Sequence, residues 1–243
     1  MIACIAAAAV GGRADVTQRT VKWPDHEFEF ARLVYNDGGL CRVYDPCWTV
    51  DYPEAESFFA EGVSRLTRTE LGHEGVMIQL ENDSMFDYPW LYAVEVGYWR
   101  LSDSEAARLR EYLLRGGFLM VDDFHGTREW ASFMNSMTRV FPDRPVLDIP
   151  DGDEVLHVLY NVDHRIQIPG IAALMRNVTW EEDGYDPHWR GIYDDDGRLM
   201  VAINHNMDLG DSWEHADDPT YPQEMTTLGI QFAVNYVIYA MTH

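Results

Sequence analysis

Two adjacent carboxylates and an imidazole follow an apolar run in the middle of the chain, at Asp122, Asp123 and His125. Close carboxylates push each other's proton affinities apart, and with an imidazole they can bind a divalent metal or serve as acid and base. The alternative is structural. Neighbouring residues on a strand point to opposite faces, so one aspartate would cap the next helix while the other meets Arg128 or solvent. All three remain candidate catalytic residues.

A second polar group follows the apolar segment 199–203. It consists of His205, Asn206, Asp208, Asp211 and Trp213. If that segment is a strand near the first, the two groups share one crevice, and Asp123, His125, His205 and Asp208 form a metal-ligand set suited to zinc, manganese or iron. The alternative is a loop in which Asn and Asp side chains bond their own backbone.

The composition restricts the partners of this protein. The chain has 243 residues and 47% hydrophobic residues, enough for one sizeable core. It has 18 basic and 41 acidic residues, a net charge of -23, and Lys22 is its only lysine. Nucleic acid and anionic membrane surfaces are therefore disfavoured. Residues 199–243 lack Lys and Arg, which makes divalent cations or cationic partners conceivable, although a solvated acidic surface explains the same pattern.

The N-terminal segment is small and apolar before it turns polar near Asp15. It resembles the second half of a secretory signal, but no positively charged region precedes it. We therefore expect residues 1–20 to be a signal-like lead and residues 21–243 to be a single domain. The expected location is periplasmic or otherwise extracytoplasmic, with the cytoplasm as the alternative. Pairing of Cys41 with Cys47 stays open. The apolar run 228–241 is too short to span a membrane.

Hydrophobic periodicity predicts alternating strands and helices. Asp51 is expected to cap the first helix, and Ser102 with Glu105 forms a capping box for the second. Predicted strands cover 28–35, 76–80, 90–96, 118–122 and 155–160, a hairpin joins 192–193 to 199–203, and predicted helices cover 52–67, 102–116, 126–140 and 223–241. This order predicts an α/β fold, with a mainly parallel sheet, helices on both faces and a C-terminal hairpin elaboration.

Aromatic residues are interleaved with acidic residues and glycines late in the chain. Trp180, Tyr185, Trp189 and Tyr193 could stack on a sugar ring, or they could form a packed mini-core under a long insertion. Glycine-rich nucleotide-binding signatures and a Gly-x-Ser-x-Gly elbow are missing from the sequence. No cofactor is predicted, although a divalent metal is possible.

Three motifs together resemble a known family. They are Asp51-Tyr52-Pro53, the run 113–126 that contains Gly116-Gly117 and Asp122-Asp123-Phe124-His125-Gly126, and the late run 204–213. They are similar to the bacterial domain of unknown function 4159. The resemblance implies a flavodoxin-like, class I glutamine amidotransferase-like fold, and it adds Asp51 and Tyr52 to the expected crevice. It also implies a cell-envelope setting.

In active glutaminases of this fold, the corresponding strand leads into an elbow that carries a cysteine nucleophile. Phe124 stands at that position here, so cysteine-dependent amidotransferase activity is disfavoured. The first hypothesis is an envelope domain that binds a small ligand or a protein partner at the degenerate elbow. Its expected ligand-binding residues are Asp51, Tyr52, Asp123, Phe124, His125, His205, Asn206, Asp208 and Trp213. The alternative is a metal-assisted hydrolase that uses the Asp and His residues.

Overall fold

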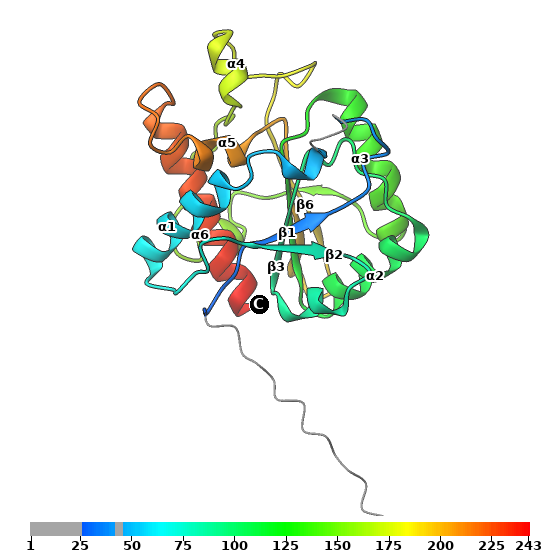
Figure 1. The fold of residues 1–243 in the computed structure, drawn as a ribbon. Helices are drawn as coiled ribbons and strands as arrows, with labels where there is room; N and C mark the ends of the chain where they lie inside the picture. The colour runs from blue at the N-terminus through cyan, green and yellow to red at the C-terminus, as the bar shows by residue number, and fades with distance from the viewer. Residues whose placement is uncertain (1–25, 42–45) are drawn as a thin grey trace, which may run out of the picture.

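A seven-stranded sheet forms the centre of the protein in the computed structural model, which describes residues 26–41 and 46–243 (Figure 1). The predicted lead, residues 1–20, lies outside the described residues. The strands are β1 (Ala31–Val34), β2 (Val76–Gln79), β3 (Trp90–Val94), β4 (Phe118–Asp122), β5 (Leu147–Asp148), β6 (His188–Tyr193) and β7 (Leu199–His205). Their order is β2-β1-β3-β4-β7-β6-β5, and β2, β1, β3, β4 and β7 run parallel.

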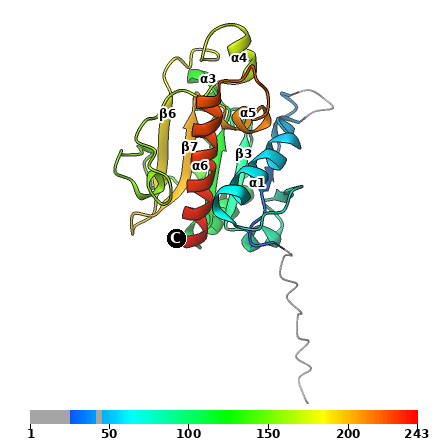
Figure 2. The same ribbon diagram turned by 90° about the vertical axis from the view of Figure 1, so that its left-hand side faces the viewer.

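Helices cover both faces of the sheet, as Figures 1 and 2 show. They are α1 (Glu54–Thr67), α2 (Asp103–Leu114), α3 (Gly126–Val140), α4 (Ile171–Met175), α5 (Leu209–Glu214) and α6 (Gln223–Thr242). One core lies under α1, α5 and α6, and the other lies under α2 and α3. Because side chains alternate along a strand, Trp90 and Tyr92 of β3 enter the first core, and Leu91 and Ala93 enter the second.

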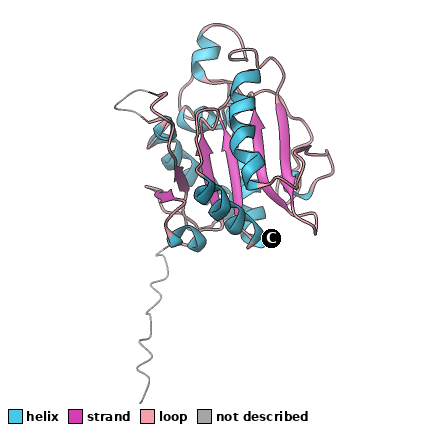
Figure 3. Ribbon diagram, turned by 90° about the vertical axis from the view of Figure 1, so that its right-hand side faces the viewer, coloured by secondary structure: helices cyan, strands magenta, loops and turns pink. Residues whose placement is uncertain are grey.

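Most predicted elements are present. Strand β4 has the predicted bounds, the Ser102–Glu105 capping box opens α2, and β6 and β7 form the predicted antiparallel hairpin (Figure 3). The mixed α/β class with a mostly parallel sheet is confirmed. The predicted strand at 155–160 is wrong, because Glu154–Leu156 forms a 3-10 turn there. Within the described residues, no helix combines the length and apolarity that crossing a membrane requires.

Two sets of contacts constrain the connection between β1 and α1. Cys41 and Cys47 form a disulfide, which answers the question that the sequence left open. The buried Arg32 of β1 donates hydrogen bonds to the backbone carbonyls of Trp48 (3.1 Å) and Val50 (2.8 Å) and pairs with Glu56 of α1. These contacts determine where the chain arrives at Asp51.

Candidate functional site

Polar residues with left-handed backbones follow four neighbouring parallel strands. Asp51 (φ 62°) lies in the connection after β1, Glu95 (φ 54°) follows β3, Asp123 (φ 48°) follows β4 and Asn206 (φ 64°) follows β7. Such a conformation costs a residue other than glycine about 1–3 kcal/mol and tends to occur at functional sites. Ligands of open α/β sheets also bind at the carboxyl ends of the strands. The strain therefore marks this edge as the candidate site.

Three carboxylates meet at this edge. Asp51, Asp208 and Asp211 each offer an oxygen, and these three atoms lie within 4.8 Å of one another. Gly170 borders the same space. A methyl group at Gly170 would lie 2.8 Å from Asp208 Oδ2, 3.1 Å from Asp211 Oδ2 and 3.0 Å from Glu181 Oε1. Glu181 is thus a fourth carboxylate beside the three, and the missing side chain of Gly170 keeps the space between them free.

Local structure explains why Asp208 and Asp211 point this way. Asp208 is the N-cap of α5, and its Oδ1 accepts a hydrogen bond from the Asp211 N–H (2.8 Å), which leaves Oδ2 directed at the cluster. Asp211 Oδ2 accepts a hydrogen bond from the Ile171 N–H (2.5 Å), which brings the first turn of α4 to the site. One carboxylate oxygen of Asp208 therefore supports the helix while the other remains free to bind a ligand.

Asp122 holds α5 against the sheet. Its Oδ2 accepts hydrogen bonds from the backbone N–H groups of Leu209 (2.7 Å) and Gly210 (3.0 Å) and from the Tyr92 hydroxyl (3.3 Å). Its Oδ1 is buried and has no partner among the described residues. Burial raises the pKa of Asp122 to about 7, against the opposing effect of those backbone hydrogen bonds. Asp122 therefore caps a helix, as the structural alternative proposed, but the helix is α5 and not the next one in the chain.

Burial and mutual repulsion disfavour the ionised forms of these carboxyl groups. Burial raises the pKa of Asp51 and of Asp208 well above the usual range, and the negative charge of Asp123 adds to both shifts. Burial also raises the pKa of Glu95 to about 10, again with Asp123 as a neighbour. Among the described residues, no lysine or arginine forms an ion pair with Asp51, Asp208 or Asp211, and only the His215 imidazole lies near Asp211, at 3.5 Å.

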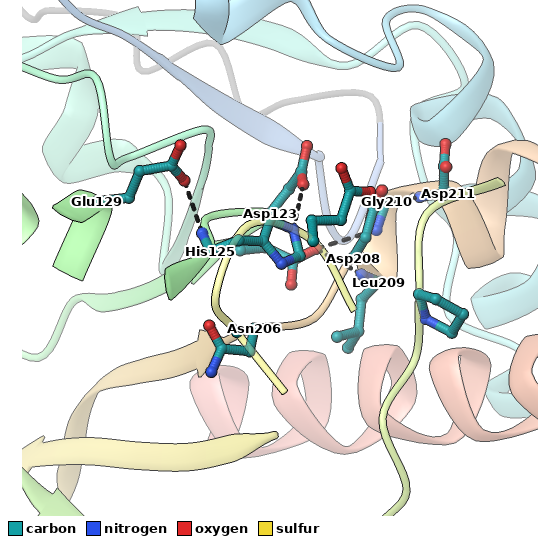
Figure 4. A network of polar contacts seen from close by, with 12 residues as sticks. Asp123, His125, Glu129, Asn206, Asp208, Leu209, Gly210 and Asp211 are labelled. Carbon is teal, nitrogen blue, oxygen red and sulfur yellow. Dashed lines mark hydrogen bonds and ion pairs between the residues drawn. The ribbon is translucent and has the colours of Figure 1, made fainter. Parts of the chain in front are cut away.

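Asp123 and His125 form a pair beside this cluster (Figure 4). The His125 Nε2 lies 3.0 Å from Asp123 Oδ1, and the His125 N–H donates to Glu129 Oε2 at 2.6 Å. The His125 Nδ1 is buried and has no partner in the described part of the chain. A carboxylate that orients one ring nitrogen leaves the other available as a proton acceptor. Asp123 and His125 thus lie close together. Arg128, which the sequence analysis offered as a partner for one of the aspartates, instead contacts Glu129 (3.8 Å).

A family model described as a domain of unknown function (DUF4159) matches residues 29–241. The chain belongs to the DUF4159 family. The matched residues run from just before β1 almost to the end of α6, so they include every residue of the candidate site. A comparison with curated proteins found no match.

The DUF4159 sheet separates two residues that the sequence had grouped with the carboxylates. His205 packs on the opposite side of β7, where its ring lies 4.8 Å from those of Phe124 and Trp130, and its Nε2 contacts the Gly126 carbonyl oxygen. Burial lowers the pKa of His205 to about 4. Phe124 is fully buried in the core under α2 and α3. Neither side chain faces the carboxylates. His205 lies on β7 with its side chain on the same face as that of Ile203, because alternate residues point to opposite faces of the sheet. Phe124 follows the end of β4, where the left-handed backbone of Asp123 (φ 48°) interrupts the alternation.

Three other predicted ligand residues of this DUF4159 domain either contribute to packing and loop contacts or line a different hollow. Trp213 is fully buried and packs against Phe59, with ring centroids 4.9 Å apart. The Asn206 side chain accepts a hydrogen bond from the Gly126 N–H and donates one to the Asp186 carbonyl oxygen, so it ties loops together. Tyr52 is 42% exposed and lines a separate hollow of about 560 Å³ with Phe58 and His73.

The prediction that Asp51 caps the first helix is wrong. The N-cap of α1 is Pro53, without a side-chain cap, and Asp51 turns its carboxylate inward, where Oδ2 is buried without a hydrogen-bond donor among the described residues. Sequence reasoning missed Glu95, Gly170 and Glu181 of this DUF4159 domain. The signals were a carboxylate directly after the buried run 90–94, and a dense acidic and aromatic segment at 180–185.

Proposed function

We propose that the domain binds a divalent cation through Asp51, Asp208 and Asp211, with Glu181 beside them. The observation that carries the proposal is the convergence of carboxylate oxygens around the empty Cβ position of Gly170. The Oδ2 of Asp51 is buried without a donor among the described residues, and so is the Oδ1 of Asp122, whose side chain supports α5. Buried charges are normally paired or coordinate a metal. A set made only of oxygens favours Ca²⁺, Mg²⁺ or Mn²⁺ over the zinc and iron expected with histidine ligands.

The strand order supports a finer fold proposal. The five parallel strands follow the order of flavodoxin-like sheets, whose switch point lies between the first and third strands. Asp51 and Glu95 follow these two strands. We infer a flavodoxin-like, glutaminase-related sheet in which Asp123, with its left-handed backbone directly after β4, stands at the elbow in place of Phe124. An aspartate there with no thiol beside it favours binding over amide hydrolysis.

Calorimetric titration of the purified domain with Ca²⁺, Mg²⁺ and Mn²⁺ tests the cation site. Wild type should bind at least one of the three ions, and Gly170→Ala should lose at least tenfold in affinity, because its methyl group would enter the space between the carboxylate oxygens. Gly152→Ala is the matched control, since a methyl group there meets no described atom within 4 Å. Equal affinity in the two variants, or no binding of any of the ions to wild type, would reject the proposal.

The Asp123–His125 pair favours a second candidate, a cation-assisted hydrolase. His125 would accept a proton from water through Nδ1 while Asp123 orients the ring. Wild type loaded with cation would then hydrolyse p-nitrophenyl acetate or a p-nitrophenyl phosphodiester, and His125→Ala would lose that activity. His157→Ala, which changes a histidine outside the site, should retain it. Identical rates for wild type and His125→Ala would end this candidate.

A location outside the cytoplasm remains part of the proposal. The Cys41–Cys47 disulfide supports it, because disulfides persist in oxidising compartments and are rare in the cytosol. Fractionation of cells that express the native gene tests it. Recovery of the protein only from cytosol would contradict this location without affecting the cation site.

A further inference from the structure

Two exposed aromatic rings stand at the ends of a short turn beside the carboxylates. Trp180 is 37% exposed and Tyr185 is 62% exposed, and their ring centroids lie 5.6 Å apart at an angle of 59°. The packed mini-core that one interpretation of the sequence expected would bury these rings, whereas Trp189 is 7% exposed and does belong to the core. Trp180 and Tyr185 therefore form a partly exposed aromatic pair that lies outside both hydrophobic cores.

Hydrogen bonds hold this aromatic turn in place. The Gly184 N–H donates to the Glu181 carbonyl oxygen (2.8 Å) and closes the turn. The Asp183 carboxylate accepts from the Thr127 N–H (2.8 Å) and hydroxyl (2.7 Å) at the start of α3. The Gln167 side chain donates to the Gly184 carbonyl oxygen (2.9 Å). Aromatic rings presented by a fixed turn lose little conformational entropy when a ligand binds.

The same turn contributes a carboxylate to the proposed cation site. Glu181 follows Trp180 directly, and its Oε1 lies 3.0 Å from the Cβ position of Gly170, where Asp208 and Asp211 oxygens also converge. The Glu181 side chain remains 29% exposed, although Asp208 and Asp211 are buried. The exposed side of the cation site and the aromatic pair are consequently neighbours along one fixed segment.

We propose that the cation site and the Trp180–Tyr185 pair together bind a neutral carbohydrate with adjacent hydroxyl groups. This inference rests on the proposed cation site. Sugar hydroxyls are oxygen ligands that can replace water on Ca²⁺ or Mn²⁺. The C–H faces of a sugar ring pack on aromatic rings, which bring large apolar area and few rotatable bonds. The net charge of -23 disfavours anionic polymers, so we propose a neutral carbohydrate and not an anionic one.

Binding of the full chain to immobilised neutral oligosaccharides of glucose, mannose and N-acetylglucosamine tests this inference, with Ca²⁺ or Mn²⁺ present and again in EDTA. At least one oligosaccharide should bind wild type with the cation and be released by EDTA. Trp180→Ala and Tyr185→Ala should each weaken binding about tenfold, as expected for a lost stacking contact. Met175→Ala, which truncates an exposed apolar side chain on neighbouring α4, should leave binding unchanged.

Several outcomes would overturn the inference. They are the absence of oligosaccharide binding, binding that persists in EDTA, and equal losses in Met175→Ala and Trp180→Ala. A cationic partner would instead bind an oligolysine probe more tightly in EDTA than with the cation. Calorimetric titration with the cation alone separates the two proposals. If the ion binds and no sugar binds, only the carbohydrate inference fails, whereas absence of ion binding rejects both.

Discussion

Two groups of ionisable residues near the start of α1 differ in how their charge is balanced. The first is the Arg32–Glu56 pair, and the second is the cluster of Asp51, Asp208 and Asp211. Glu56 is 1% exposed and pairs with the fully buried Arg32. Asp51, Asp208 and Asp211 also converge, but no lysine or arginine of the described chain pairs with them. Breaking a buried pair leaves an uncompensated charge, which is strongly destabilising. The first group is therefore balanced within the described fold, whereas the second group is the one for which we propose a cation from solution.

Removal of Arg32 should have the largest effect. Arg32→Met leaves Glu56 buried without its cation and removes the donors to Trp48 and Val50, so we expect a loss of about 3–5 kcal/mol in the free energy of unfolding. Urea unfolding measures it. Arg65→Ala, which breaks the exposed Arg65–Glu61 pair, should cost less than about 1 kcal/mol. Similar losses in both variants would remove the distinction between the two groups.

Added cation should raise the free energy of unfolding only through the second group, Asp51, Asp208 and Asp211. At about a hundredfold excess over its dissociation constant, Ca²⁺ or another bound ion should stabilise wild type by about 2.7 kcal/mol. Asp208→Asn should lose most of this gain, because an amide is neutral while its oxygen can still cap α5. Arg65→Ala should keep the gain in full. Stabilisation of Asp208→Asn equal to that of wild type would place the ion elsewhere.

Reduction of the Cys41–Cys47 disulfide should have an intermediate effect. It releases a short loop in the connection that leads to Asp51, and the expected loss is about 2 kcal/mol. Cation affinity should fall as well, because the connection that carries Asp51 loses one of its two constraints while Arg32 retains its bonds. Unfolding and calorimetric titration with and without a reductant measure both quantities, and Cys41→Ser with Cys47→Ser should reproduce them. Unchanged cation affinity after reduction would mean that Arg32 alone positions Asp51.

The smallest effect concerns pH in the absence of cation. Because the pKa of Asp208 is raised by folding, wild type carries a penalty that is absent below the unfolded pKa of about 4 and grows as pH rises toward the folded pKa. Asp208→Asn should therefore match the stability of wild type at about pH 4 and exceed it at about pH 8. Urea unfolding in EDTA at several pH values measures the difference. A difference that shrinks as pH rises would contradict the raised pKa.

Local sequence signals were sufficient for most of the framework. The Ser102–Glu105 capping box, the apolar run of β4 and the spacing in 126–140 are read within a few residues, so their elements could be predicted closely. The strand predicted at 155–160 was wrong because the apolar residues of this segment pack against the core from a turn and not from a strand. The helix cap predicted at Asp51 was wrong because Pro53 occupies the N-cap position. The Asp51 carboxylate instead lies with two aspartates that are distant in the sequence.

The sequence by itself determined that carboxylates and an imidazole would stand at the end of β4, directly after a buried run. Only the tertiary structure decided which of them meet. Residues from distant positions in the sequence lie together in the structure: Asp51, Gly170, Glu181, Asp208 and Asp211. His205 and Phe124 lie on the other face of the sheet. The reason is physical: strand alternation and loop paths determine the direction of each side chain, and those depend on contacts far apart in the chain.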